Sequence, residues 1–169
     1  MKQNIAHNSA PASQKMNSKE KRKILVIGSI NVDLVFKTEH LPLRGETIFS
    51  THFETHFGGK GANQAFTAGK IGYKENLEVT LLGAVGEDNY GQDSLANLKK
   101  NGCVNVEHIF TLPEVSTGLA NIVVAKNGDN TIIVNSGANF AIAQKSALYG
   151  GEVQFIKRAQ ALIDQHDII

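Results

Sequence analysis

A glycine-rich segment at residues 57–65, Phe-Gly-Gly-Lys-Gly-Ala-Asn-Gln-Ala, has the composition of a site for a polar ligand. Its three glycines let a ligand approach the backbone, and they open a predicted helix whose first N–H groups lack intrahelical partners. Lys60 and Asn63 add a cation and an amide. Such glycines also permit close packing of a helix on a strand, so the segment alone does not separate the two roles. The spacing completes neither a Walker A loop nor Gly-x-Gly-x-x-Gly, which argues against nucleotide phosphate binding through those motifs.

A second polar pair, Asn31 and Asp33, follows an apolar run at residues 23–28. In an extended chain, side chains two positions apart lie on one face, so this amide and this carboxylate can reach neighbouring hydroxyls of one polyol. The end of a buried strand is also where open α/β sheets bind ligands. An Asx turn after a strand is the structural alternative, and for the pair taken alone it is the commoner one.

The elements that must position these residues alternate along the chain as expected of an α/β fold. The run at 23–30 predicts a strand buried on both faces, and 78–85 predicts a second. Segments 32–36 and 46–57 are typical of strands exposed on one face, which we assign to a side sheet. Two β-branched runs flanking Lys-Asn-Gly-Asp predict a hairpin. The hairpin strands are 118–124 and 130–134, and the predicted helices are 60–71, 91–101 and 145–165.

The two ends of the sequence carry separate expectations. Residues 1–22 are polar and lack the apolar core of a signal or membrane span, which predicts a disordered extension. Residues 167–169 have the pattern of the opening of a third buried parallel strand, which would leave unpaired backbone groups if it stopped there. We therefore expect the chain to be truncated.

Composition limits the classes of partner. The 169 residues, 41% of them hydrophobic, suffice for one core of ordinary domain size. With 17 Lys and Arg against 16 Asp and Glu, no strong field favours nucleic acid or an anionic membrane surface. The single cysteine, Cys103, cannot form an intramolecular disulfide, and no Cys/His spacing typical of zinc occurs. We expect a reducing compartment, the cytoplasm.

Taken together, these segments resemble the PfkB carbohydrate kinase family, and the ribokinases within it. The resemblance rests on Val-Ile-Gly-Ser-Ile-Asn-Val-Asp, Leu-Pro-Leu-Arg-Gly-Glu-Thr, Phe-Gly-Gly-Lys-Gly-Ala-Asn-Gln-Ala, Leu-Leu-Gly-Ala-Val-Gly-Glu-Asp, Ser-Thr-Gly and Asn-Ser-Gly-Ala-Asn, in that order. It implies that residues 23–169 are the N-terminal part of such a kinase domain. The implied fold is a partial Rossmann-like ribokinase fold of the α/β class, with a small β-sheet lid formed by segments 32–57 and 118–134.

The resemblance also implies a function, which is ATP-dependent phosphorylation of D-ribose at its 5-hydroxyl. ATP, Mg²⁺ and a monovalent cation such as K⁺ would take part, and the chain would form a homodimer through the lid. Asn31 and Asp33 would bind sugar hydroxyls, and three residues of the glycine-rich segment would line the pocket that Asn63 completes. The implied substrate-binding residues are thus Asn31, Asp33, Gly58, Gly59, Lys60 and Asn63.

The departures from the family pattern concern the catalytic half. The Gly-Ala-Gly-Asp segment, whose helix N-terminus and Asp serve phosphoryl transfer in the family, is absent from this sequence. Neither Asp88 nor Asp129 takes its place, so no catalytic residue is assigned, and the ATP and metal-ion sites are expected outside this chain. Three alternatives stay open: a kinase fragment inactive alone, a non-catalytic sugar-binding or dimerising module, and another PfkB sugar or nucleoside kinase. Ribose and deoxyribose are not distinguished.

Overall fold

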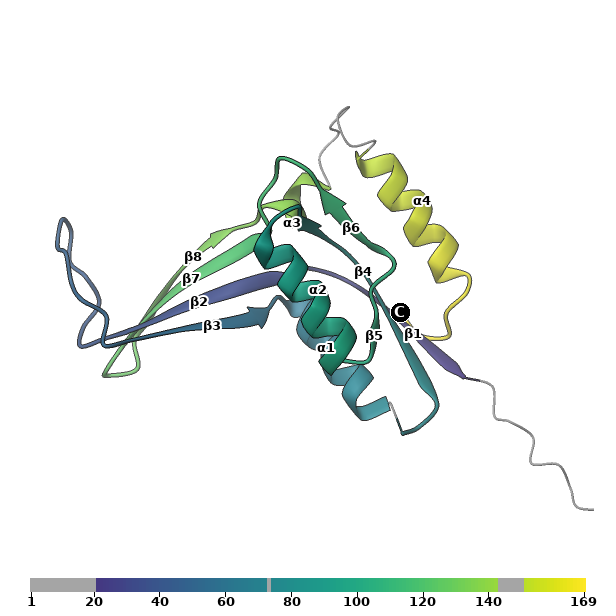
Figure 1. The fold of residues 1–169 in the computed structure, drawn as a ribbon, viewed down its shortest axis with the longest axis horizontal. Coiled ribbons are helices and arrows are strands. Elements are labelled where there is room, and N and C mark those ends of the chain that lie inside the picture. Colours follow the sequence, from purple (N-terminus) through teal and green to yellow (C-terminus); the bar gives the residue numbers. More distant parts are fainter. Residues whose placement is uncertain (1–20, 73, 143–150) are drawn as a thin grey trace, which may run out of the picture.

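The computed structural model describes residues 21–72, 74–142 and 151–169, which form two β-sheets and four helices (Figure 1). The first sheet is parallel throughout, and β4 lies at its centre. Its strands are β1 (Arg22–Ile27), β4 (Leu77–Gly86), β5 (Val104–Asn105) and β6 (Ile109–Leu112). The predicted α/β class is confirmed.

Helices cover both faces of the first sheet, which explains why its strands are continuously apolar. On one face, Val79 and Leu81 of β4 pack in a core with α1 (Lys60–Gly72) and α2 (Asn89–Asn101). On the other face, Leu82 packs with Leu162 of α4 (Gly151–Ile163). The remaining helix, α3 (Ala138–Ala141), packs its buried Ala138 in a cluster with Ala84 of β4.

The second sheet extends away from the helices (Figure 1), and its strand order is β3-β2-β7-β8. β2 (Asn31–Thr38) pairs antiparallel with β3 (His52–Gly58) and parallel with β7 (Gly118–Ala125). β8 (Asn130–Asn135) completes the predicted hairpin with β7. Because β2 follows β1 after the short link 28–30, the two sheets join at the end of β1.

One predicted strand is too long. Residues 46–51 belong to a loop, and β3 begins only at His52. The Glu46 carboxylate accepts a hydrogen bond from the Leu43 backbone N–H at 2.8 Å and contacts His40 at 3.1 Å, so its side chain closes a turn. The alternation of residue types in this segment therefore does not reflect a ladder.

Smaller differences lie at the ends of elements. α2 begins at Asn89, two residues before the predicted start, because the Asp88 carboxylate caps it by accepting from the Gly91 N–H at 2.8 Å. The short elements β5, β6 and α3 were not predicted. The polar extension up to residue 20 and the first residues of the predicted helix 145–165 lie outside the described residues.

The expected third strand leaves a trace beside β1. Ile168 forms a parallel bridge with Ile24, and the Leu25 N–H donates to the Ile168 carbonyl at 2.9 Å. Ile168 is 43% exposed, unlike the buried strand that was expected.

Candidate functional site

Three elements meet where the two sheets join: the start of β2, the end of β3 and the start of α1. Asn31 is the register partner of Gly58, and Asp33 is the partner of His56. The start of α1 lies directly on the link between β1 and β2, since the Ala62 N–H donates to the Ser29 carbonyl at 3.0 Å. The two strands and the helix thus bring residues from both polar segments to one place.

The close approach at this junction depends on glycine. A Cβ on Gly61 would lie 2.6 Å from the carbonyl carbon of Gly28, nearer than side chains can come. Gly59 has a φ of +91°, and a Cβ there would lie 2.7 Å from the Asn31 nitrogen. These glycines are therefore needed for the close packing of α1 on the link between β1 and β2. This packing does not exclude the ligand role, because the N–H groups of Lys60 and Gly61 donate to no other backbone group in the described ranges.

Asp33 is the acidic group of the junction. Its carboxylate lies over Gly58, where a Cβ would collide with it and come within 2.9 Å of its Cγ. Partial burial raises the pKa of Asp33 above its ordinary value of 3.8, and the nearby His56 opposes that shift. A partly desolvated carboxylate beside a glycine backbone is suited to accept hydrogen bonds from a neutral polar ligand.

Lys60 and Asn63 lie on the first turn of α1, and both are exposed. Neither side chain makes a hydrogen bond or ion pair with another described residue. The structure thus brings all six predicted site residues to one junction. Asn31 and Asp33 belong to β2, and Gly58 and Gly59 lie at the end of β3 and directly after it. Lys60 and Asn63 are exposed on the first turn of α1.

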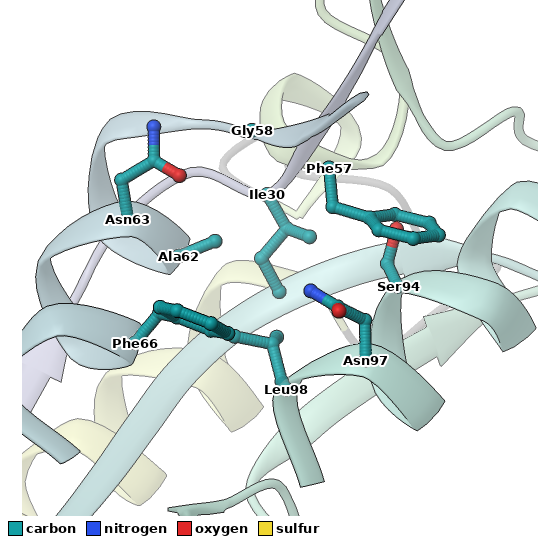
Figure 2. Close-up of a pocket in the computed structure, with 9 residues that line it drawn as sticks. All are labelled: Ile30, Phe57, Gly58, Ala62, Asn63, Phe66, Ser94, Asn97 and Leu98. Carbon is teal, nitrogen blue, oxygen red and sulfur yellow. The ribbon is translucent and has the colours of Figure 1, made fainter. Parts of the chain in front are cut away.

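A cavity of about 130 Å³ adjoins the junction, and Figure 2 shows the residues around it. It shares Gly58 and Asn63 with the predicted site, and its other lining residues are apolar except for Ser94 and Asn97. Because neighbouring residues of a strand point to opposite faces, Phe57 lines this cavity while His56 shares the face of Asp33. The cavity is therefore not the place that Asp33 faces. Its lining residues are Ile30, Phe57, Gly58, Ala62, Asn63, Phe66, Ser94, Asn97 and Leu98.

Sequence reasoning missed Asn139, which belongs to α3 but reaches the β1–β2 link. Its side chain hydrogen-bonds the backbone of Ile30 and the side chain of Asn31. The sequence offered one signal, the Asn-Ser-Gly-Ala-Asn motif that ends at this residue. The separation of 109 positions from Ile30 hid the contact.

The fold and the junction define an α/β domain with a parallel sheet, and with a second sheet beside a polar, glycine-lined site. A family model described as pfkB family carbohydrate kinase matches residues 21–166. The chain belongs to the PfkB family of carbohydrate kinases.

Named relatives place the chain near one branch of that family. It is 43% identical to "Ribokinase" of Schizosaccharomyces pombe over 118 residues, which are 69% of this chain and 37% of that protein. It is 40% identical to "Ribokinase" of Bacillus subtilis over 147 residues, 87% of this chain and 47% of that protein. The structure of Arabidopsis thaliana ribokinase complexed with ribose and ATP is similar with a TM-score of 0.65 and 30% identity, over 82% of this chain and 43% of that one. This chain therefore spans about half the length, or less, of the relatives it matches.

Among the described residues, no helix is both long and apolar enough to cross a membrane. Within the same ranges, no three His, Cys, Asp or Glu side chains are grouped to hold a metal ion.

Proposed function

We propose that this chain forms the sugar-binding part of a ribokinase-like kinase, which phosphorylates D-ribose at the 5-hydroxyl with ATP. The observation that carries the proposal is the Asp33 carboxylate over Gly58, with Asn31 on the same face of β2 and the start of α1 beside it. Membership of the PfkB family and the resemblance to proteins named ribokinase support it.

Each site residue takes a role that follows from its chemistry. Asp33 accepts hydrogen bonds from two sugar hydroxyls, and Asn31 binds a neighbouring one. Gly58 and Gly59 keep the pocket wall free of side chains, so that the sugar can lie against the backbone. Lys60 and Asn63, which are exposed at the start of α1, contact the sugar from the solvent side of the pocket.

The nucleotide and the metal ions are implied by the family, and we propose ATP, Mg²⁺ and a monovalent cation for the whole kinase. The residues described here do not fit them. A cavity of about 220 Å³ at the carboxyl ends of β1 and β4 is lined chiefly by Ile27, Ala84, Ile142 and Phe155, without a charged side chain. Such a lining offers a Mg²⁺–nucleotide neither cation nor carboxylate. No catalytic step is assigned to these residues.

Ribose titration of the 169-residue chain, followed by NMR or calorimetry, tests the sugar site. We expect Asp33→Ala to weaken ribose binding by about 2 kcal/mol or more, roughly thirtyfold, because a charged acceptor of two hydroxyls is lost. Asp33→Asn tests the charge with little change in shape. Asp129→Ala, in the exposed turn between β7 and β8, is the matched control and should bind ribose normally. Equal ribose affinity of Asp33→Ala and the unchanged chain would refute the assignment.

The second candidate is a sugar-binding module without catalysis, and the missing Gly-Ala-Gly-Asp segment favours it for these 169 residues taken alone. An ADP-coupled assay with ribose, ATP, Mg²⁺ and K⁺ separates the candidates. We expect ribose binding without ribose-dependent ADP release, since bound sugar cannot replace the groups that stabilise the moving phosphoryl. Turnover at an ordinary kinase rate would show that this chain contains a catalytic site.

We also propose that the second sheet serves as a lid over the sugar and as a surface for self-association. It carries exposed apolar side chains on both faces, among them Ile133 at 68% exposure on one face and Ile132 at 53% on the other. An isolated monomer seldom exposes such a group of neighbouring apolar side chains.

The cytoplasmic location stays a prediction. It is based on the single cysteine of the sequence, Cys103, which is a free and exposed thiol in the structure.

A further inference from the structure

We infer that Asn139 is a positioning residue that sets the amide orientation of Asn31, so that Asn31 offers its NH₂ group as a donor to the sugar. This inference rests on the proposed sugar site and adds to it a determinant of specificity. The pair would then recognise a vicinal diol, with Asn31 donating to one hydroxyl oxygen and Asp33 accepting from a neighbouring hydroxyl.

The orientation of Asn139 follows from backbone groups whose roles are fixed. Its Oδ1 accepts from the Ile30 N–H at 2.9 Å, and its Nδ2 donates to the Ile30 carbonyl at 2.9 Å. Reversing the amide of Asn139 would place donor against donor and acceptor against acceptor at Ile30. The NH₂ group of Asn139 is therefore the one that faces the Ile30 carbonyl. One of its hydrogens bonds that carbonyl, and the other points to Asn31.

The second hydrogen of Asn139 Nδ2 determines the orientation of Asn31. It points to Oδ1 of Asn31, and the two atoms are 2.8 Å apart. Since only an oxygen can accept this bond, the NH₂ group of Asn31 must point away from Asn139. In the described part of the chain, that NH₂ group has no hydrogen-bond partner, which leaves its hydrogens available to a ligand.

Residues of β7 and α3 keep Asn139 in place beside Asn31. A Cβ on Gly118, the register partner of Asn31 in β7, would collide with both amides. Ala138 is fully buried, and its N–H donates to the Ser116 carbonyl at 2.8 Å, which fastens α3 to the start of β7. Asn139 therefore cannot move away without disturbing buried packing.

The three hydrogen bonds of Asn139 have different consequences. The two bonds to Ile30 secure the link between β1 and β2 and would stabilise the fold with or without a ligand. The third bond adds direction to the side chain of Asn31. A pocket that presents one donor and one acceptor rejects ligands that lack the matching hydroxyls, because its partly buried polar groups would stay unpaired.

NMR of the side-chain amides in the unchanged 169-residue chain tests the orientation directly. We expect the NH₂ protons of Asn139 to exchange slowly with water and those of Asn31 to exchange rapidly. In Asn139→Asp, the carboxylate still accepts from the Ile30 N–H but can only accept from Asn31, so the Asn31 amide should turn and its protons should become protected. A protected Asn31 NH₂ group in the unchanged chain would overturn the inference, as would an Asn31 amide that Asn139→Asp leaves unaffected.

Ribose titration of the same variants tests the consequence for binding. Asn139→Asp should weaken ribose binding at least tenfold. Asn135→Asp, a matched control whose side chain contacts Ser116 at the other end of the motif, should not. If Asn139→Asp fails to fold, Asn31→Asp serves instead: it keeps the bond from Asn139 but replaces the outward donor by an acceptor, and it should cause a similar loss. Unchanged ribose affinity in a folded variant would overturn the role of Asn139. If the unchanged chain binds no ribose, the proposed function fails, while the amide exchange still decides the orientation.

Discussion

At the scale of single residues, the second sheet carries two carboxylates whose pKa values are shifted in opposite directions. Partial burial raises the pKa of Asp33 above 3.8, whereas hydrogen bonds from His56, Lys37 and His52 lower the pKa of the exposed Glu54 to about 2. His56 donates to Glu54 at 2.8 Å and is the cross-strand partner of Asp33. One imidazole therefore acts on both acids.

A pH titration of the two carboxyl carbons by NMR tests these pKa shifts. We expect a midpoint above 3.8 for Asp33 and near 2 for Glu54, and His56→Gln should raise both, because His56 favours the charged form of each acid. Exposed Lys126, in the distal turn, gives a control in Lys126→Gln. A midpoint of Asp33 at or below its ordinary value, or one that His56→Gln lowers, would contradict this account.

The signs of these shifts determine how each acid affects stability. The raised pKa of Asp33 means that its contribution to stability is present when the acid is protonated and is lost as the pH rises through the pKa. The lowered pKa of Glu54 means the reverse: its contribution is present above 4.5 and is lost as the pH falls towards 2. Sugar binding needs the charged form of Asp33, so ribose affinity should fall when the pH drops through the pKa of that residue.

At the scale of elements, Asp88 connects α2 to the start of β7. Its carboxylate accepts from the Gly91 N–H at 2.8 Å, and from the Thr117 N–H at 2.8 Å and hydroxyl at 2.6 Å. Burial raises the pKa of Asp88, but these hydrogen bonds outweigh burial and hold the pKa below its ordinary value. Asp88 thus has a structural role, because it joins the N-terminus of α2 to the segment that precedes β7.

The prediction for this element is a loss of stability in Asp88→Ala. We expect the free energy of unfolding to fall by about 1 to 3 kcal/mol, since a helix cap is lost and the fully buried Thr117 loses its acceptor. Urea unfolding at neutral pH measures the change, and exposed Asp93→Ala on the same helix is the control. Equal stability of the two variants would show that the cap is dispensable. The stabilisation should also decrease as the pH falls through the lowered pKa of Asp88.

At the scale of the whole molecule, the two sheets differ in how they are covered. The first sheet has helices on both faces, while the outer half of the second extends away from the helices (Figure 1). In the second sheet, successive side chains of a strand point to opposite faces, so the apolar side chains fall into two sets, one on each face. Phe53 packs on Phe36 with ring centroids 4.8 Å apart and shares a face with Ile133, while Ile132 lies on the face of Asp33.

The prediction at this scale is self-association through the face of Phe53. Sedimentation at micromolar concentration should show a dimer, and Ile133→Lys should yield the monomer because a charge cannot be buried there without a partner. Ile132→Lys, on the neighbouring residue but the opposite face, is the matched control and should leave the dimer intact. Monomers at all concentrations would count against the surface, and dissociation by Ile132→Lys alone would move the interface to the other face.

The sequence by itself determined the features that depend on near neighbours. Continuous apolar runs indicated β1 and β4, small residues at helical spacing indicated α1, and the turn between two β-branched runs indicated the hairpin of β7 and β8. The glycine-rich segment and the spacing of Asn31 and Asp33 likewise marked the junction, since these signals lie within a few positions of one another.

Only the tertiary structure decided which distant groups meet. Local periodicity does not encode partners, so it gave neither the place of β2 between β3 and β7 nor the contact of Asp88 with Thr117, 29 positions away. It also overextended β3, because side-chain bonds of Glu46 close a turn where residue types alternate as in a strand. The orientation of Asn31 depends on Asn139, 108 positions along the chain. A directed hydrogen bond of this kind exists only when folding brings both amides to the same backbone link, and no pattern within either segment can specify it.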